Sequence, residues 1–339
     1  MKYIIITTIA SPTPAVRSFA SIPGWHTVVV GDKKTPPEWS CPAVEYLAPR
    51  AQQDSSFTLS RLLPWNHYCR KTIGYLHAIQ QGAELIVDTD DDNLPMANWG
   101  FEPFDGNFFL TTPNSGFLNV YRFFSDQFVW PRGFPLRQLR QSSTLPHDPN
   151  RQFVRVGVWQ ALADGDPDVD AIYRLVFNHP VFFQPREPVV LGKGTICPFN
   201  SQNTAFRREL FALMYLPCHV NFRFTDILRG LVAQPIMWAA DFLLGFTHAT
   251  VVQERNPHDY LEDFRSEIPC FLHAEDVIAI VQSAIKSSDS VEENLYSAYS
   301  ELCRAKIVAE QEIGCVSAWL VDLARARQDS SHFFVAHGV

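Results

Sequence analysis

The sequence contains no hydrophobic run long enough to cross a membrane. Its longest apolar stretch, residues 235–246, has about half of the roughly 20 residues that a span requires, and Asp241 interrupts it. Basic residues (28) are fewer than acidic ones (36), so we expect no nucleic-acid partner. Glycine is scarce as well, at 16 of 339 residues, which excludes a collagen-like repeat. The 46% of hydrophobic residues instead indicates a globular chain with a sizeable core.

The cysteines lack the spacing of a disulfide framework or a redox motif. There are seven of them, no two lie in a Cys-x-x-Cys pair, and the chain has no Asn-x-Ser/Thr sequon. An odd number of unpaired thiols is typical of a reducing compartment. The N-terminal apolar run, residues 3–9, follows one lysine and is too short for a secretory leader. We therefore expect a cytoplasmic protein with free thiols.

Several common catalytic and phosphate-binding motifs are also missing. The sequence has no G-x-G-x-x-G fingerprint that opens a helix, no Walker A motif, no H-E-x-x-H and no G-x-S-x-G. The aspartates from Asp164 to Asp170 are spaced as in a calcium loop. However, Val169 and Leu175 stand where an EF-hand starting at Asp164 needs glycine and glutamate. We reject the calcium-loop interpretation.

The N-terminal part of the sequence shows an alternation of strand and helix patterns. Residues 2–9, 27–31 and 84–87 are short apolar runs typical of buried strands, and residues 64–81 form a helical pattern that begins with Pro64 and stops before Gly82. This order predicts an α/β fold with a mostly parallel sheet flanked by helices. Ligands of such sheets bind beyond the carboxyl ends of the strands.

The rest of the chain has less regular patterns. Residues 98–198 are rich in proline, glycine and aromatics and predict irregular connections with short strands near 153–156 and 189–196. Helical patterns return at residues 207–213, 225–246 with a bend near Pro235, 274–286 and 291–326. The last two contain no chemical cluster, so we expect a helical appendage at the C-terminus.

The strongest chemical signal is an acidic cluster. Asp88, Asp90, Asp91 and Asp92 directly follow the strand at 84–87. Like charges this close raise one another's pKa and require compensation, which in proteins is commonly a divalent cation with oxygen ligands. A solvated acidic turn is the alternative. The position at the carboxyl end of a parallel strand favours the cation.

Basic residues precede this cluster. Arg70 and Lys71 lie on the helix that leads into the acidic strand, and no acid occurs between residues 55 and 83. They are candidates for binding a diphosphate through charge-assisted hydrogen bonds, and an exposed solubilising helix face is the alternative. Asp32 follows the second strand, where a carboxylate accepts hydrogen bonds from a ribose or a base. A plain turn aspartate fits the spacing of Asp32 equally well.

Several short sequence motifs resemble those of a known family. The runs at 69–75 and 90–92, the Arg132-Gly-Phe-Pro segment, and the runs at 167–171, 193–198 and 203–210 resemble the plant UDP-arabinopyranose mutases, also called reversibly glycosylated polypeptides. A closer resemblance is to the catalytic-like region of the STELLO proteins, which are glycosyltransferase-like. It rests on the words at 31–36, 70–82, 88–93, 130–136 and 164–175 and spans about residues 1–270.

This resemblance implies a GT-A-like, Rossmann-like fold. Residues 1–270 would form the nucleotide-sugar-binding catalytic domain and residues 271–339 the C-terminal helical appendage. The donor would be a nucleoside-diphosphate sugar, with UDP as the expected nucleotide, and the acceptor an unidentified glycan or other molecule. The cofactor would be Mn²⁺ or Mg²⁺. The chain would be a free-standing version without the membrane anchor of the plant proteins, and a homo-oligomer is left open.

The resemblance also implies site residues. Asp90 and Asp92 would hold the metal, with Asp90 also contacting the ribose, and the role of Asp91 is left open. Further nucleotide contacts are expected from Thr8, Asp32, Arg70, Lys71 and Asn203. Catalytic roles are expected for Arg132, Asp168, Asp170 and Asp226. The position of a late metal-binding histidine holds Val251 or Val252, so His248 and His258 are weak substitutes, because a lone histidine is more often structural.

Three functions are compatible with these residues. In a metal-dependent glycosyltransferase, Asp226 would be a general base or would orient the acceptor, unless it only stabilises a helix N-terminus. In a UDP-sugar mutase, Arg132 would carry the sugar transiently, although a phosphate-binding or structural arginine fits as well. The third function is a non-catalytic scaffold, which gives no reason for the electrostatic cost of the acidic cluster. The sequence does not decide between inversion and retention.

Overall fold

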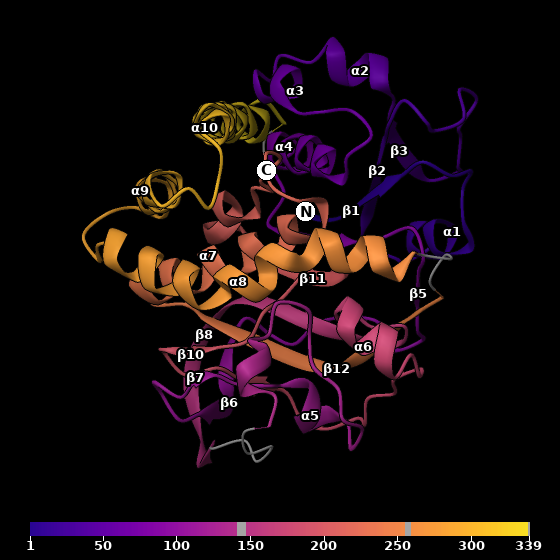
Figure 1. The fold of residues 1–339 in the computed structure, drawn as a ribbon. Coiled ribbons are helices and arrows are strands. Elements are labelled where there is room, and N and C mark those ends of the chain that lie inside the picture. Colours follow the sequence, from indigo (N-terminus) through magenta and orange to yellow (C-terminus); the bar gives the residue numbers. More distant parts are fainter. Residues whose placement is uncertain (141–146, 255–258, 338–339) are drawn as a thin grey trace.

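A computed structural model describes residues 1–140, 147–254 and 259–337 (Figure 1). The fold is mixed α/β, with a large sheet of mostly parallel and mixed strands flanked by helices, as in Rossmann-like proteins. The described strands of this sheet follow the order β3-β2-β1-β4-β11-β8-β6-β9-β12-β5. The α/β class expected from the alternating pattern is therefore confirmed.

The N-terminal half of the sheet is parallel. β1 (Lys2–Thr8) lies between β2 (His26–Gly31) and β4 (Leu85–Thr89), and β3 (Val44–Leu47) extends the sheet beyond β2. These strands are apolar on both faces because both faces are covered. Ile5 and Val30 belong to a core under α4 (Lys71–Gln80), whereas Ile4 and Val29 belong to a second core under α1 (Pro14–Ala20).

The other half of the sheet contains strands from the middle of the chain, where mainly irregular connections were expected. β11 (Asn203–Arg207) runs antiparallel between β4 and the long strand β8 (His147–Gly165). β12 (Leu243–Gln253) pairs in parallel with β8 and in antiparallel with β5 (Asn93–Pro95). Further strands are β6 (Asp105–Thr111) and β9 (Val189–Val190) in this sheet, and β7 (Gly116–Phe117) with β10 (Thr195–Ile196) in a small second sheet. The strand predicted at 153–156 is only a short part of β8, because charged and polar residues interrupt the apolar pattern of the longer strand.

Two predicted helices have different bounds in the structure. The helix predicted from residue 64 begins at Lys71, because Asn66 adopts a left-handed φ of 58° and a short 3₁₀ helix, η1 (Tyr68–Arg70), follows it. The helix predicted for 225–246 ends earlier, as α7 (Thr225–Ala239). Asp241 has a φ of 59°, which a helix does not allow, and the apolar residues after it belong to β12.

The C-terminal helices pack on the same core as the sheet. α8 (Tyr260–Ala284) and α9 (Val291–Arg304) pack beside α7, whereas α10 (Gln311–His337) packs on α9 and α4 (Figure 1). The predicted helix 291–326 is thus two helices, separated by a turn in which Lys306 has a φ of 60°. The predicted division between residues 270 and 271 falls inside α8.

Shorter elements complete the described chain. They are α2 (Pro49–Gln53), α3 (Leu59–Leu62), α5 (Tyr121–Phe124), α6 (Ala171–Val176), η2 (Leu136–Gln138), η3 (Arg208–Met214) and η4 (Phe222–Phe224). The segment predicted as a helix at 207–213 is largely η3. Among the described residues, no helix combines the length and the hydrophobicity that crossing a membrane requires.

Candidate functional site

Two adjoining pockets lie beyond the carboxyl ends of β1, β2 and β4. The first, called here the acidic pocket, has a volume of about 230 Å³ and is lined by Thr7, Tyr68, Asp90, Asp91, Asp92, Arg132, Asp168, Asn200, Ser201, Gln202, Phe222, Arg223, Asp226 and Gln253. The second, the β1–β2 pocket, has a volume of about 200 Å³ and is lined by Thr7, Thr8, Ile9, Val30, Gly31, Asp32, Lys34, Asn66, His67, Tyr68, Arg70, Asp91 and Phe222. The two pockets share Thr7, Tyr68, Asp91 and Phe222, so they are continuous.

Asp32 is fixed at the base of the β1–β2 pocket. It directly follows β2, and its Oδ1 accepts hydrogen bonds from the backbone N–H groups of Lys33 (2.6 Å) and Asn66 (2.8 Å). Its Oδ2 accepts one long bond from the N–H of His67 (3.2 Å). The carboxylate is therefore held in place and keeps capacity to accept a bond from a ligand.

Arg70 lines the same pocket, but its donors are directed into the protein. The guanidinium group is 1% exposed and stacks 3.5 Å above the Trp65 ring. It donates to Gln52 Oε1 (2.6 Å), to the Leu63 carbonyl (3.1 Å) and to Ser60. The alternative of an exposed solubilising residue is thus wrong for Arg70. The geometry favours a residue that shapes the pocket over one that binds phosphate.

Lys71 is fully buried and faces the acidic cluster instead of a pocket. Its ammonium donates to Asp88 Oδ1, to the Thr89 carbonyl and to Asp90 Oδ1, each at 2.8 Å. These bonds use all three of its donors. Arg229 on α7 pairs with the other oxygen of Asp88 at 2.7 Å. The exposed alternative is therefore wrong for Lys71 too, and its contacts neutralise carboxylates.

The acidic turn retains negative charge that no described side chain neutralises. Asp91 accepts a hydrogen bond from the Thr8 hydroxyl, and Asp92 Oδ2 accepts one from Gln253 Nε2 (3.1 Å). The buried Oδ1 of Asp92 has no hydrogen-bond partner among the described residues. Burial, together with Asp92, raises the pKa of Asp90 to about 7 against the effect of Lys71. Four carboxylates thus face two cations, an arrangement that fits a divalent cation held by oxygen ligands.

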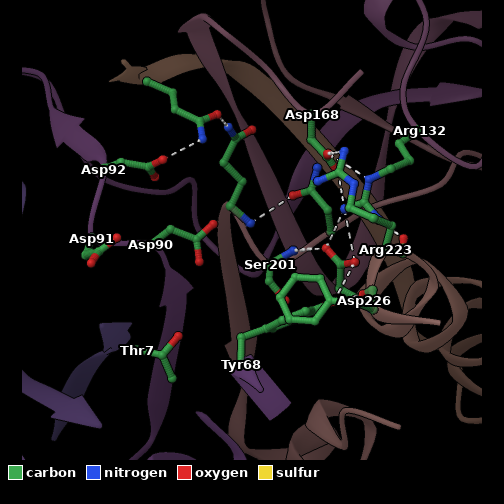
Figure 2. A pocket seen from close by; sticks show the side chains of 14 residues that line it. Thr7, Tyr68, Asp90, Asp91, Asp92, Arg132, Asp168, Ser201, Arg223 and Asp226 are labelled. Carbon is green, nitrogen blue, oxygen red and sulfur yellow. Dashed lines mark hydrogen bonds and ion pairs between the residues drawn. The ribbon is translucent and has the colours of Figure 1, made fainter. Parts of the chain in front are cut away.

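The opposite wall of the acidic pocket is an ion-pair network (Figure 2). Arg132 forms a bidentate pair with Asp168, with both N···O distances at 2.8 Å, and also donates to Asp226 Oδ1 (3.1 Å) and Oδ2 (3.0 Å). Asp226 accepts further bonds from the Tyr68 hydroxyl (3.1 Å) and the Ser201 N–H (3.2 Å). The expected residues Arg132, Asp168 and Asp226 are thus brought together, across the pocket from Asp90–Asp92.

This network keeps its groups charged. Burial alone would raise the pKa of Asp226, but Arg132, Arg229 and Arg223 outweigh it and lower that pKa. Burial alone would lower the pKa of Arg132, but Asp168 and Asp226 raise it well above its usual range. Arg132 is therefore a guanidinium cation with its Nε, Nη1 and Nη2 all donating to protein oxygens.

Besides Lys71, two expected site residues, Asp170 and Asn203, lie outside both pockets. Asp170 caps α6 through the Tyr173 N–H (2.9 Å) and accepts a bond from Trp130 Nε1 (2.6 Å), and burial raises its pKa to about 7. Asn203 lies in β11, where its amide donates to Thr250 Oγ1 at 2.9 Å. Both are buried and hold neighbouring segments, so the geometry gives them positioning roles.

The weaker histidine candidates do not join the acidic cluster. His248 Nε2 lies 3.4 Å from the Asn98 amide, outside both pockets. His258 lies outside the described residues. Val251, at the position considered for a late metal ligand, is buried in β12.

Several pocket residues were not found from the sequence. They are Tyr68 in η1, Phe222 and Arg223 in η4, and Gln253 at the end of the unpredicted strand β12. Arg223 donates to Glu267 Oε1 on α8 at 2.8 Å, which links the pocket to that helix. The polar run at 200–202 was the one visible signal, because uncharged polar residues after an apolar strand often face a ligand.

Comparison with known proteins supports the resemblance inferred from sequence words. A profile of the STELLO glycosyltransferases matches residues 223–334. The chain is 26% identical over 350 aligned residues to the probable glycosyltransferase STELLO1 of Arabidopsis thaliana, which covers 95% of this chain and 44% of that protein. It is 28% identical over 263 residues to the probable glycosyltransferase STELLO2 of the same plant, covering 70% and 34%.

These matches extend the expected range of similarity. They confirm the resemblance to STELLO-type proteins, and the profile match includes Arg223, Asp226 and most of α8, α9 and α10. The resemblance is therefore not confined to residues 1–270. The chain spans less than half of the length of the two relatives.

Proposed function

We propose that this STELLO-like chain is a glycosyltransferase that transfers a sugar from a UDP-sugar with the help of Mn²⁺ or Mg²⁺. The similarity to proteins described as probable glycosyltransferases supports the reaction class. The observation that carries the proposal is the acidic pocket, in which the buried, unpartnered Asp92 Oδ1 and the half-buried Asp90 face a space continuous with the β1–β2 pocket. We infer from these features a GT-A type site with a DxD motif.

The nucleoside is assigned to the β1–β2 pocket. Asp32 is prepositioned by three backbone N–H groups and can accept from a ribose hydroxyl or a base N–H. Beside it, His67 stacks on Tyr68 and Phe222 packs at an angle against both rings, so the three offer ring surface. Lys34 lines this pocket and is exposed, so it is a better diphosphate contact than the internally bonded Arg70.

The cation is assigned to Asp90 and Asp92. When bound, it would neutralise the charge that develops on the departing nucleoside diphosphate. Lys71 holds Asp90 in place from behind, and Gln253 does the same for Asp92. Asp91 is held by Thr8, so its orientation supports the turn and it is not needed as a ligand.

The acceptor is assigned to the far wall, at Asp168 and Arg223. The two oxygens of Asp226 already accept bonds from Arg132, Tyr68 and Ser201 and from the Ile227 N–H, which leaves little capacity for an acceptor hydroxyl. Among the described residues, Asp168 accepts hydrogen bonds from Arg132 alone, one to each oxygen, and Arg223 lies 4.0 Å from its Oδ1. Asp168 is therefore the better group to orient an acceptor hydroxyl and take its proton, and Asp226 holds Arg132 and Tyr68 in place.

The mutase alternative is disfavoured by the state of Arg132. A guanidinium that is buried, paired with two carboxylates and held by a backbone carbonyl has no free nitrogen to attack a sugar. Intact-mass measurement after incubation with UDP-sugars should show no hexose or pentose on the chain. An adduct on Arg132 would contradict this and favour the mutase.

Calorimetry and thermal shift with UDP, with and without Mn²⁺, test the proposal. We expect Mn²⁺-dependent stabilisation of about 2.7 kcal/mol at a hundred times the dissociation constant. Asp92→Asn should abolish the Mn²⁺ dependence while the chain stays folded. The matched control, Asp276→Asn, removes an exposed carboxylate on α8 and should change nothing. A normal Mn²⁺ dependence in Asp92→Asn would remove Asp92 from the site.

A panel of UDP- and GDP-sugars then tests the donor. We expect release of UDP from at least one UDP-sugar in the presence of Mn²⁺, and loss of that release in Asp92→Asn. Binding of UDP without turnover of any sugar donor in the panel would favour the scaffold alternative.

A further inference from the structure

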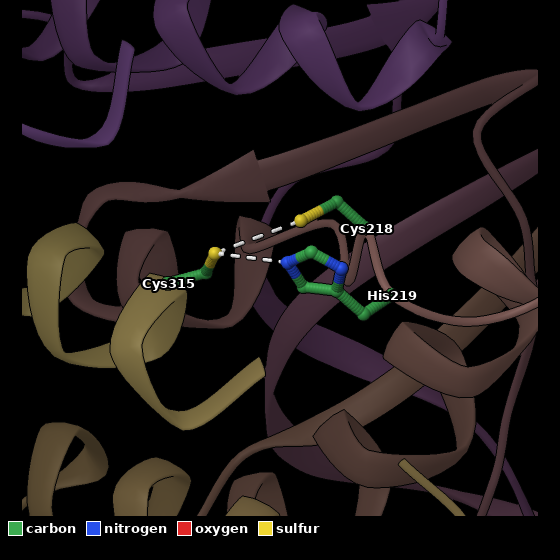
Figure 3. Close-up of side chains that lie close together, drawn as sticks. All are labelled: Cys218, His219 and Cys315. Carbon is green, nitrogen blue, oxygen red and sulfur yellow. Dashed lines mark hydrogen bonds between the residues drawn. The ribbon is translucent and has the colours of Figure 1, made fainter. Parts of the chain in front are cut away.

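A second group of ligand-type side chains lies away from both pockets. Cys218 and His219 follow η3, and Cys315 lies on α10, nearly a hundred residues later in the chain (Figure 3). The Sγ atoms of Cys218 and Cys315 are 3.7 Å apart, and Cys315 Sγ lies 3.7 Å from His219 Nε2. All three ligand atoms lie within 4.8 Å of one another. Both thiols are buried, whereas His219 is exposed.

These distances are those of a tetrahedral zinc centre. With Zn–S bonds of about 2.3 Å and Zn–N bonds of about 2.0–2.1 Å, two sulfurs at a tetrahedral angle are about 3.8 Å apart and a sulfur and a nitrogen about 3.6 Å. The observed separations of 3.7 Å and 3.7 Å match both values. The three side chains thus need little movement to bind one ion. Two thiolates and an imidazole also form a ligand set that favours zinc over Mg²⁺ or Mn²⁺.

The surroundings of the group provide an independent indication of a positive charge. Glu312, one turn before Cys315 on α10, is fully buried, and no described residue forms an ion pair with it. Its carboxylate accepts hydrogen bonds from the N–H groups of His219 (2.7 Å) and Cys218 (3.2 Å) and from the Tyr215 hydroxyl. It therefore fixes the backbone that carries two of the ligands. A nearby cation would offset the cost of burying this charge.

We propose that Cys218, His219 and Cys315 bind one Zn²⁺ ion, with water in the fourth position. The ion would connect α10 to the segment that leads from η3 to Phe222 and Arg223, two residues of the acidic pocket. The site is separate from the acidic turn in position and in ligand chemistry. It concerns this chain's stability and does not depend on the proposed transfer reaction.

The competing explanations are a disulfide and a simple contact between thiols. A disulfide has a sulfur separation of about 2.05 Å, so the Cys218 and Cys315 sulfurs would have to approach by well over an ångström. A thiol contact alone leaves His219 Nε2 beside Cys315 without a role and leaves Glu312 without a cation. The zinc site accounts for both neighbours.

Metal titration of the full-length chain tests the proposal under reducing conditions. We expect one equivalent of zinc after purification without chelator or after reconstitution. Co²⁺ in place of zinc should produce a thiolate-to-cobalt charge-transfer band, which the all-oxygen acidic turn cannot give. Absence of this band in the folded wild-type chain would overturn the proposal. A non-reduced chain lighter by two hydrogen atoms, with a disulfide mapped to Cys218 and Cys315, would overturn it as well.

Variants locate the site. Cys315→Ser and His219→Gln should each lower zinc affinity at least tenfold and remove or weaken the cobalt band. Cys303→Ser, a half-buried thiol on α9 outside the group, is the matched control and should keep both. If Cys303→Ser loses zinc as strongly as Cys315→Ser, the assignment is wrong. Because the wild-type titration stands alone, poor folding of one variant does not remove the test.

Discussion

The ammonium group of Lys71 lies 2.8 Å from a carboxylate oxygen of Asp90, and the same group lies 2.8 Å from Asp88. One buried cation thus joins α4 to the acidic turn. Because burial alone would lower the pKa of Lys71, the fact that this pKa is raised shows that the two carboxylates outweigh desolvation. The first-turn residue of α4 is therefore part of the framework of the site.

Lys71→Met should be strongly destabilising. It leaves Asp88 with Arg229 alone and Asp90 without a cation, and breaking a buried pair on one side costs about 3–5 kcal/mol. Urea unfolding of the variant measures this loss. Lys34→Met, which removes an exposed ammonium, should change the free energy of unfolding by less than about 0.5 kcal/mol. Equal effects of the two substitutions would mean that the Lys71 pairs contribute nothing.

Arg70→Ala should weaken the binding of UDP and of uridine by similar factors. The guanidinium holds Gln52, Ser60 and Leu63 around the β1–β2 pocket, and its donors are not free for phosphate. Calorimetry with both ligands separates shape from charge. Arg61→Ala, an exposed arginine on α3, is the control and should bind both ligands normally. A loss confined to UDP would restore Arg70 as a phosphate contact.

Trp319→Ala tests whether α10 is part of the main core. Trp319 is fully buried, donates to the Ala212 carbonyl (2.9 Å) and packs on Tyr215. Its truncation should cost about 3–5 kcal/mol. Val321→Ala, at a 56% exposed position on the same helix, should be nearly neutral. A small effect of Trp319→Ala would show that α10 is dispensable for the fold.

His67 should make the stability depend on pH. Burial lowers its pKa to about 4, against the effects of Glu312 and Asp32, whereas the unfolded chain has the usual value of 6.5. Below pH 6.5 the unfolded chain therefore binds a proton that the folded chain does not. The free energy of unfolding therefore keeps its full value above pH 6.5. It falls by about 1–3 kcal/mol as the pH drops towards 4.

His67→Asn isolates this effect, because the asparagine carbonyl can still accept from the Cys69 N–H as His67 Nδ1 does at 3.0 Å. Chemical unfolding between pH 4 and pH 7 should show a flatter profile for this variant than for the wild type. His26→Asn, at an exposed position, should keep the wild-type profile. A wild-type slope in His67→Asn would assign the pH dependence to other groups.

The parallel half of the site could be predicted because its signals are local. Asp32 and Asp90–Asp92 directly follow apolar strands, and strand ends of a parallel sheet meet at one edge. The inward direction of Arg70 and Lys71 was not predictable. A basic pair on a helix without neighbouring acids is usually exposed, and their partners Gln52 and Asp88 become neighbours only in the folded chain.

The other half of the site depends on long-range pairing. β8 and β12 carry mixed polar and apolar residues, so their pattern is not that of a typical strand. Near Asp241 the apolar pattern continues from the helix into β12, although the positive φ of Asp241 ends the helix. The resemblance nevertheless pointed to the network, because Arg132 and Asp168 lie in its matching segments and it also implied a role for Asp226. Gln253 and Arg223 had no comparable signal.

The strands on either side of the acidic turn are paired with segments from much later in the chain. Thr89 pairs with Asn203 in β11, and Asn93 pairs with Gln253 in β12. A ribosome must therefore have made and released most of the polypeptide before this turn can take its final shape. In nascent chains stalled before β12, the four aspartates would lie beside a sheet that still lacks this strand. Such chains should neither retain nucleotide nor resist proteolysis.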